Sequence, residues 1–170
     1  MNPPGYATID EVIELGVLLL AMAKTYHVKK KGEFFYDALF FPLLKARCQS
    51  ASRQEKLKLR PGQKRRQRLD FRLGGGSFSP ALELAHGSRR GGLGPSSNES
   101  ELQKLCRQKN AQMRYLLLLD TSKYDPYTKD ELRAQYSGWN LGPGRFARRP
   151  VRVIYARVGH SFHFKWKASK

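Results

Sequence analysis

Cysteine, acidic residues and long apolar runs are all scarce in this chain of 170 residues. Cys48 and Cys106 are the only cysteines, which excludes a scaffold held together by several disulfide bonds. The longest uncharged apolar run covers residues 15–23, whereas a helix needs about 20 apolar residues to cross a bilayer. We therefore expect no transmembrane segment.

Motifs that carry catalysis or hold cofactors are missing as well. The glycines at 74–76 lack the lysine and hydroxyl residue of a phosphate-binding loop, and no nucleophile elbow occurs. The four histidines are too dispersed to predict a metal site. A solvated loop and a helix start account for Asp120, Asp125, Asp130 and Glu131. The sequence thus predicts no enzyme, no cofactor, no metal and no small-molecule substrate.

Basic residues are abundant by contrast, and they are concentrated in two segments. The chain has 32 Lys and Arg against 14 Asp and Glu, a formal net charge of +18. Residues 1–50 have a net charge of only +1, whereas residues 51–72 carry +7 and residues 141–170 carry +8. Charge packed this densely repels itself unless an anion neutralises it, so we expect a polyanionic partner.

The chain divides by composition into three segments that predict an α+β fold. Residues 1–50 predict a pair of apolar helices, the first begun by a capping box of Thr8 and Glu11 and the second kinked or divided at Pro42. The pair carries more apolar residues than two helices can hide from water, so we expect it to dock on another protein. The candidate docking residues are Val12, Val17, Leu20, Phe34, Phe35, Phe40 and Phe41.

The second segment, residues 51–97, shows no usable period and is rich in Gly and Arg. We interpret it as a long, irregular, extended basic arm. The third segment, residues 98–170, predicts a small α+β unit. Asn98 and Thr128 are candidate N-caps, and residues 115–119 form either a buried strand or the continuation of a helix. Strict alternation after residue 160 predicts a basic C-terminal hairpin with an aromatic face.

Arginine dominates both basic segments, and it binds phosphate bidentately and stacks on bases. No sequence-specific RNA- or DNA-binding signature is present, so recognition of the RNA backbone and shape is expected. The candidate RNA-binding residues are Arg60, Lys64, Arg65, Arg66, Arg68, Arg72, Arg89, Arg90, Arg145, Arg148, Arg149, Arg152, Arg157, Lys165 and Lys167.

These patterns favour a non-catalytic structural subunit of a lineage-specific, organellar ribosome, bound to rRNA and to neighbouring proteins of a large assembly. We expect a mitochondrial location, although the chain shows no recognisable cleavable presequence. The alternative is an accessory subunit of a mitochondrial respiratory-chain or ATP-synthase complex, in which the arginines would meet acidic proteins or anionic lipid headgroups.

Overall fold

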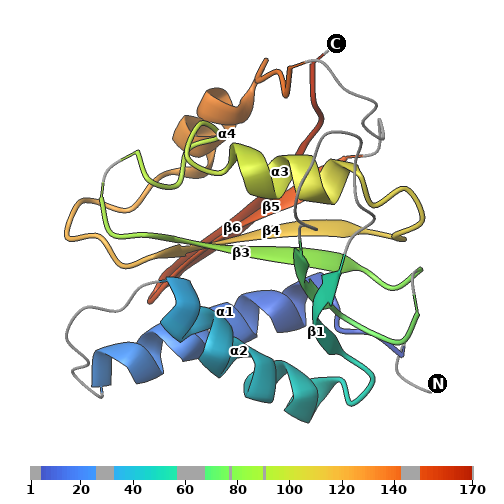
Figure 1. Ribbon diagram of the computed structural model, residues 1–170. Coiled ribbons are helices and arrows are strands. Elements are labelled where there is room, and N and C mark those ends of the chain that lie inside the picture. The colour runs from blue at the N-terminus through green and yellow to red at the C-terminus, as the bar shows by residue number, and fades with distance from the viewer. Residues whose placement is uncertain are drawn as a thin grey trace.

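Six strands form one mixed sheet in the order β1-β2-β3-β4-β5-β6 (Figure 1). The computed structural model describes residues 5–25, 33–56, 68–76, 78–89, 91–142 and 150–169. β2 is antiparallel to both of its neighbours, β1 and β3, whereas β3, β4 and β5 are parallel, and β6 is antiparallel to β5. The bounds are β1 Ser52–Lys56, β2 Arg68–Arg72, β3 Ala81–Gly87, β4 Arg114–Asp120, β5 Val151–Arg157 and β6 His160–Trp166.

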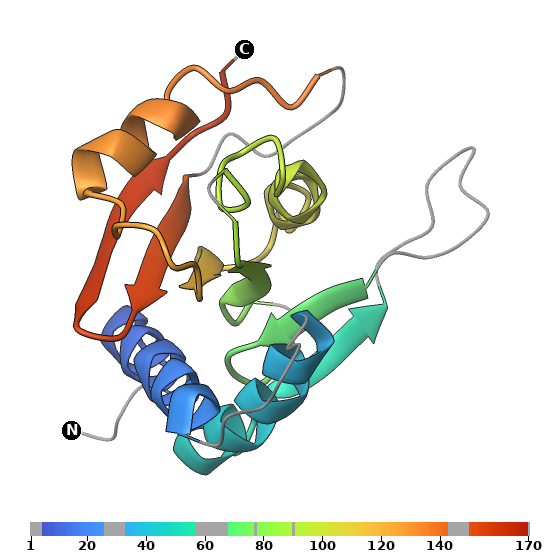
Figure 2. The ribbon, with the colours of Figure 1, turned by 90° about the vertical axis from the view of Figure 1, so that its left-hand side faces the viewer.

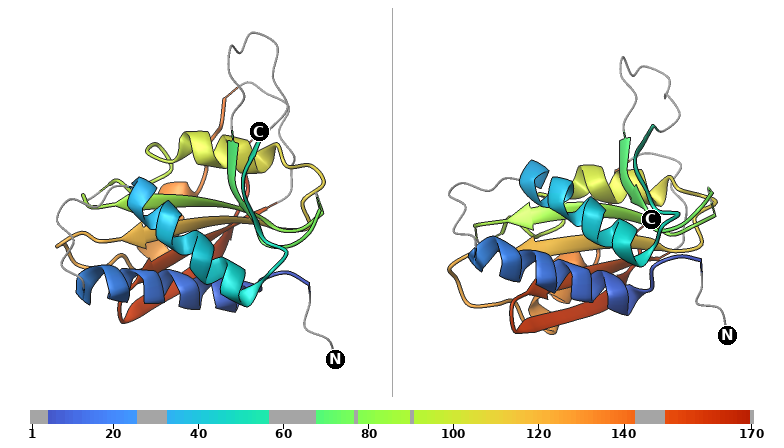
Figure 3. Two further views of the ribbon diagram at one scale, coloured as in Figure 1. Left: turned by 60° about the horizontal axis from the view of Figure 1, so that its bottom comes forward. Right: turned by 90° about the horizontal axis from the view of Figure 1, so that it is seen from below.

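Helices cover both faces of this sheet. α1 (Ile9–Thr25) and α2 (Glu33–Arg47) lie side by side across one face, and α3 (Glu99–Cys106) and α4 (Lys129–Tyr136) lie on the other (Figures 1 and 3). α3 and α4 each occur within a connection between parallel strands, which needs a crossover and cannot be a tight turn. The α+β class, the N-terminal helical pair and the C-terminal hairpin are confirmed.

The sheet separates two apolar cores. Leu82, Leu84, Leu117 and Ile154 pack with α1 and α2 on one face. Side chains that alternate with them, such as Leu116 and Val153, pack with α3 and α4 on the other. Residues 115–119 are therefore a strand that is buried on both faces, and not the continuation of a helix.

The apolar side chains of the helical pair are covered largely by this chain's own sheet. Val12, Leu20 and Phe40 are buried, and the Phe40 ring lies 5.2 Å from the ring of Phe71 on β2. Val17, Phe35 and Phe41 are partly buried and pack against the same core, and the side chain of Phe34 lies outside the described residues. The sheet of this chain therefore covers most of the apolar residues that were expected to dock on another protein.

The expectation of an irregular arm over residues 51–97 is wrong where the structure describes that segment, because β1, β2 and β3 lie in it. β1 has the sequence SRQEK and forms the edge of the sheet, where a polar strand is tolerated because one side faces solvent. β1 was not predicted because its sequence lacks the alternation of apolar and polar residues that indicates a strand. Residues 57–67 lie outside the described part of the chain.

Local predictions near the helix and strand ends are confirmed with one exception. Thr8 and Thr128 both exchange hydrogen bonds with the acid three residues later, as a capping box requires. Gly159, at a φ of +80°, closes the hairpin between β5 and β6. The Asn98 side chain, in contrast, makes no cap bond and donates to the carbonyls of Gly92 and Gly94. No helix among the described residues is long and apolar enough to cross a membrane.

Candidate active site

The sheet opens between β2 and β3. These strands pair only at Phe71 with Leu82 and at Arg72 with Ala81, whereas β1 stays paired with β2 back to Arg68. In Figure 2, β1 and β2 accordingly extend away from the strands on the other side of β3. A backbone gap inside a sheet leaves amide and carbonyl groups without their usual partners, so other groups have to satisfy them.

Two carboxylates fill this opening. The Asp70 amide donates to Oε1 of Glu83 (3.3 Å), and Oδ2 of Asp70 accepts a hydrogen bond from the Leu84 amide (2.9 Å). The side chains thus replace the ladder bonds that the backbones of β2 and β3 no longer make. Glu83 has no exposed surface, and Asp70 is half-buried.

Lys104 of α3 provides the positive charge for this pair. Its ammonium group donates to Oε2 of Glu83, lies 3.4 Å from the carbonyl oxygen of Arg68, and is 4.0 Å from Glu101. Burial raises the pKa of Glu83 well above its ordinary value, the Asp70 charge adds to this, and Lys104 opposes it. Burial lowers the pKa of Lys104, but the Glu83 and Asp70 carboxylates outweigh it, and that pKa is raised.

A third acid, Asp37 of α2, lies near this group. Its Oδ2 pairs with Arg53 at 2.6 Å, while its buried Oδ1 has no hydrogen-bond partner among the described residues. Burial raises the pKa of Asp37, Arg53 lowers it, and the charge of Asp70 raises it. We call Asp70, Glu83 and Lys104 the carboxylate–lysine cluster, and Asp37 is a neighbouring acid whose pKa responds to the charges of Asp70 and Lys104.

The cluster has the donor set that hard divalent cations prefer. Mg²⁺ is commonly held by one or two carboxylates, and water and substrate phosphates complete its coordination. Within the described residues no three His, Cys, Asp or Glu side chains are close enough to hold a metal by themselves. A cation at Asp70 and Glu83 would therefore need oxygen ligands from water and substrate, as at a site that acts on phosphate esters.

Many of the residues predicted to bind RNA fall in parts of the chain that the structure does not describe. These are Arg60, Lys64, Arg65, Arg66, Arg90, Arg145, Arg148 and Arg149. Arg68 begins β2 two residues before Asp70 and is exposed, as are Arg89, Lys165 and Lys167. Exposed basic side chains therefore lie beside the cluster and on the C-terminal hairpin.

Three of the predicted RNA-binding arginines make contacts within the protein. Arg72 is buried and donates to Oε1 of Gln108 (2.6 Å) and to the carbonyl of Ser79. Arg152 lies 3.4 Å from Nδ1 of His163, and Arg157 pairs with Asp120 at 3.3 Å. Arg72 thus has a structural role that the net charge alone did not indicate.

The carboxylate–lysine cluster was not predicted from the sequence. Asp70 lies between Leu69 and Phe71, and Glu83 lies between Leu82 and Leu84. The available signal was a single acid inside each of two short apolar runs. Such an acid indicates a buried carboxylate with a compensating partner, because an uncompensated carboxylate is rarely buried. The runs were overlooked because the glycines and basic residues around them were interpreted as an irregular arm.

Comparison with protein-family models, curated proteins and solved structures finds no match to this chain.

Proposed function

We propose that this protein hydrolyses phosphodiester bonds of a nucleic acid with the help of a divalent cation. The observation that carries the proposal is the meeting of Asp70 and Glu83 at the opening between β2 and β3, with Lys104 on Glu83. Metal-bound water is a strong nucleophile near neutral pH, and the cation also polarises the phosphoryl oxygen. The formal net charge of +18 favours a polyanionic substrate.

Each member of the cluster has a separate role in this proposal. Asp70, the half-buried acid, offers its carboxylate to the cation from the side that solvent reaches. Glu83 supplies the second carboxylate, and Lys104 holds it in place. The Lys104 ammonium also places a fixed positive charge beside the site, where negative charge develops on the phosphate during reaction. Arg68 and the basic side chains within residues 57–67 precede Asp70 in the chain. Their positive charge favours binding of a phosphate backbone near the site.

The test uses the full chain with end-labelled single- and double-stranded DNA and RNA. Each substrate is incubated with Mg²⁺, Mn²⁺, Ca²⁺ or a chelator. Asp70→Asn is the decisive variant, because an amide oxygen still accepts the Leu84 hydrogen bond while the charge is lost. Asp130→Asn on α4 is the matched control, since Asp130 is exposed and distant in the chain from the cluster.

Cleavage by the unaltered protein is expected with Mg²⁺ or Mn²⁺ and not with the chelator. We expect Asp70→Asn to lower the rate by about 100-fold or more, the order found when one stabilising group of an active site is removed, and Asp130→Asn to leave it unchanged. Cleavage at an undiminished rate by Asp70→Asn contradicts the role of Asp70. Absence of cleavage on all four substrates with every cation overturns the proposal.

A second candidate is the non-catalytic, rRNA-binding structural subunit of an organellar ribosome. The exposed Lys165 and Lys167 on the C-terminal hairpin favour it, because such a surface suits a phosphate backbone. It predicts that the protein co-sediments with ribosomal subunits and is released by nuclease. Retention in a detergent-solubilised membrane complex that ignores nuclease would instead support the respiratory-chain or ATP-synthase alternative.

The salt dependence of RNA binding tests the basic residues of this second candidate. Replacement of Arg65, Arg66 and Arg68 together by Gln should weaken binding and reduce the slope of log K against log salt by about 2 to 3, about one for each phosphate that is no longer neutralised. Lys109→Gln, an exposed site outside the basic segments, is the control. An unchanged slope in the triple variant contradicts the assignment.

A further inference from the structure

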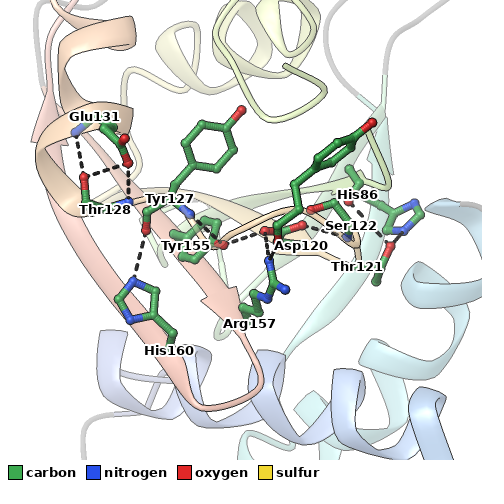
Figure 4. A network of polar contacts seen from close by, with 12 residues as sticks. His86, Asp120, Thr121, Ser122, Tyr127, Thr128, Glu131, Tyr155, Arg157 and His160 are labelled. Atoms are coloured by element: carbon green, nitrogen blue, oxygen red, sulfur yellow. Dashed lines mark hydrogen bonds and ion pairs between the residues drawn. The ribbon is translucent and has the colours of Figure 1, made fainter. Parts of the chain in front are cut away.

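A second polar site lies at the other end of the sheet, where β4 and β5 finish. Asp120 ends β4 and is buried, and its Oδ2 accepts hydrogen bonds from the Tyr155 hydroxyl (2.5 Å) and from Arg157 (3.3 Å) (Figure 4). Its Oδ1 accepts from the Ser122 amide at 2.8 Å. The expectation that Asp120 belongs to a solvated acidic loop is therefore wrong, because this carboxylate organises the strand ends.

The hydrogen bonds of this network hold its side chains in place. The same Arg157 nitrogen, Nη1, also donates to the carbonyl oxygen of Tyr124 (2.6 Å), so two acceptors fix this end of the guanidinium. The Thr121 hydroxyl lies 2.6 Å from Nε2 of His86, and the centre of the His86 ring lies 4.6 Å from that of Tyr36 on α2, with the two rings tilted by 32°. Burial lowers the pKa of His86, whereas the Asp120 charge raises it by less. Because its pKa is lowered, His86 is mostly neutral near neutral pH and adds little positive charge to this network.

A cavity of about 450 Å³ opens beside this network. Its lining includes the polar residues Thr121, Ser122 and Arg157 and the apolar residues Leu20, Ala23 and Val158. Its volume falls in the range of small-molecule sites, and it lies at the carboxyl ends of parallel strands, where open α/β sheets commonly bind ligands.

The charges around the cavity favour an anion. Asp120 and Arg157 compensate one another, and only about 1% of the Asp120 side chain is exposed. Lys24, in the last turn of α1, also lines the cavity and has no ion-pair partner among the described residues. The remaining charge is positive, and hydroxyl and guanidinium donors suit phosphate oxygens.

We propose that this cavity binds a small organic phosphate of about the size of a nucleoside monophosphate. Lys24 and Arg157 bind the phosphate, with the hydroxyl of Ser122 as an additional donor. Leu20, Ala23 and Val158 contact the organic part. The cavity is separate from the carboxylate–lysine cluster. Gly87 of β3 pairs with Asp120 of β4, and Glu83 lies four residues before Gly87 on the same strand. Four residues of a strand extend over about 13 Å.

Val158 provides the sharpest test. It is exposed, precedes Gly159 in the two-residue turn of the hairpin, and lines the cavity. Val158→Asp adds a negative charge at the cavity, and Val158→Asn adds a side chain of nearly the same shape without charge. Both Asp-Gly and Asn-Gly are favoured in two-residue hairpin turns, so both variants should fold. Lys24→Gln on α1 and the control Lys109→Gln complete the set.

Binding of adenosine monophosphate, uridine monophosphate, inorganic phosphate and adenosine to the full chain is measured by calorimetry at 150 mM salt. We expect at least one monophosphate to bind more tightly than either phosphate or adenosine alone. Val158→Asp should weaken this binding about tenfold relative to Val158→Asn, as a charge a few ångströms away implies. Lys24→Gln should weaken it several-fold, and Lys109→Gln should not.

Two results overturn this proposal. The first is that no monophosphate binds. The second is equal weakening by Lys24→Gln and Lys109→Gln, which would show that the anion responds only to the net charge of the protein. Nucleic-acid cleavage is not part of either readout, so failure of the proposed hydrolytic function leaves this test intact. Conversely, Asp70→Asn should leave monophosphate binding unchanged.

Discussion

Glu83 is the most deeply buried acid among the described residues. It has no exposed surface, and its ionised form depends on the ammonium of Lys104. Removal of one partner of a buried ion pair leaves an uncompensated charge, which typically costs about 3 to 5 kcal/mol. The carboxylate–lysine cluster therefore influences stability whether or not it has a chemical role.

The first prediction concerns the pH dependence of Lys104→Met. The folded-state pKa of Glu83 is already raised, and loss of Lys104 raises it further. A raised acid pKa means that the folded state binds the proton more tightly, so stability is lost as pH rises above the ordinary Glu value. We expect the variant to lose about 3 kcal/mol of unfolding free energy at pH 8 and clearly less at pH 5.

Urea unfolding at pH 5, 7 and 8 measures this difference, with Lys109→Met as the exposed control. An equal loss at all three pH values would mean that Lys104 stabilises the fold through packing of its aliphatic chain and not through its charge.

At the scale of elements, short local interactions determine where the helices start. Thr128 accepts from the Glu131 amide at 3.2 Å, and Glu131 accepts from the Thr128 amide at 2.8 Å. The same exchange occurs between Thr8 and Glu11 at the start of α1. The two boxes have the same spacing, so α1 and α4 begin for the same physical reason.

The second prediction is that Thr128→Ala lowers the unfolding free energy by about 1 kcal/mol, the usual cost of a lost N-cap. Thr128→Ser retains the hydroxyl and should be within a few tenths of a kcal/mol of the unaltered protein. Thermal unfolding followed by circular dichroism measures both variants. Equal losses for Ala and Ser would contradict the role of the hydroxyl.

Where β3 ends, the requirement is steric. A Cβ at Gly87 would lie 2.6 Å from Cγ of Leu93, a buried side chain in the loop that follows β3. The third prediction is that Gly87→Ala costs about 2 kcal/mol through overpacking. The same change should cost less in a Leu93→Ala background, because the clash is gone. A cost that is unchanged in that background would locate the strain elsewhere.

At the scale of the whole molecule, the net charge of +18 opposes compactness. Like charges repel one another across the surface, and salt screens exposed charges over a Debye length of about 10 Å at 0.1 M. The Glu83–Lys104 pair is mostly buried, and salt screens such a pair much less.

The fourth prediction is that the melting temperature rises when NaCl increases from 20 to 300 mM, because screening relieves the repulsion among exposed basic residues. Calorimetric melts of the full chain at fixed pH measure it. A melting temperature that falls with salt would mean that attractive surface ion pairs outweigh the repulsion.

The sequence by itself determined the features that depend on neighbours within a few residues. The capping boxes at Thr8 and Thr128 and the alternation after residue 160 were predicted because hydrogen bonds and side-chain direction there repeat over two to four residues. The predicted Asn98 cap is absent because the side-chain amide donates to the carbonyls of Gly92 and Gly94, six and four residues earlier, and such local alternatives are not visible in the capping pattern alone.

Only the tertiary structure decided which distant segments meet. Nothing local in residues 52–56 or 68–72 requires them to pair, and this pairing turns a predicted basic arm into part of the sheet. Asp70 and Lys104 lie 34 residues apart in the sequence. They and Glu83 become neighbours only because β2 separates from β3 while α3 packs on β3 and β4, from where Lys104 reaches Glu83. Contacts at that separation depend on strand register and on long-range burial, which act on the whole chain at once.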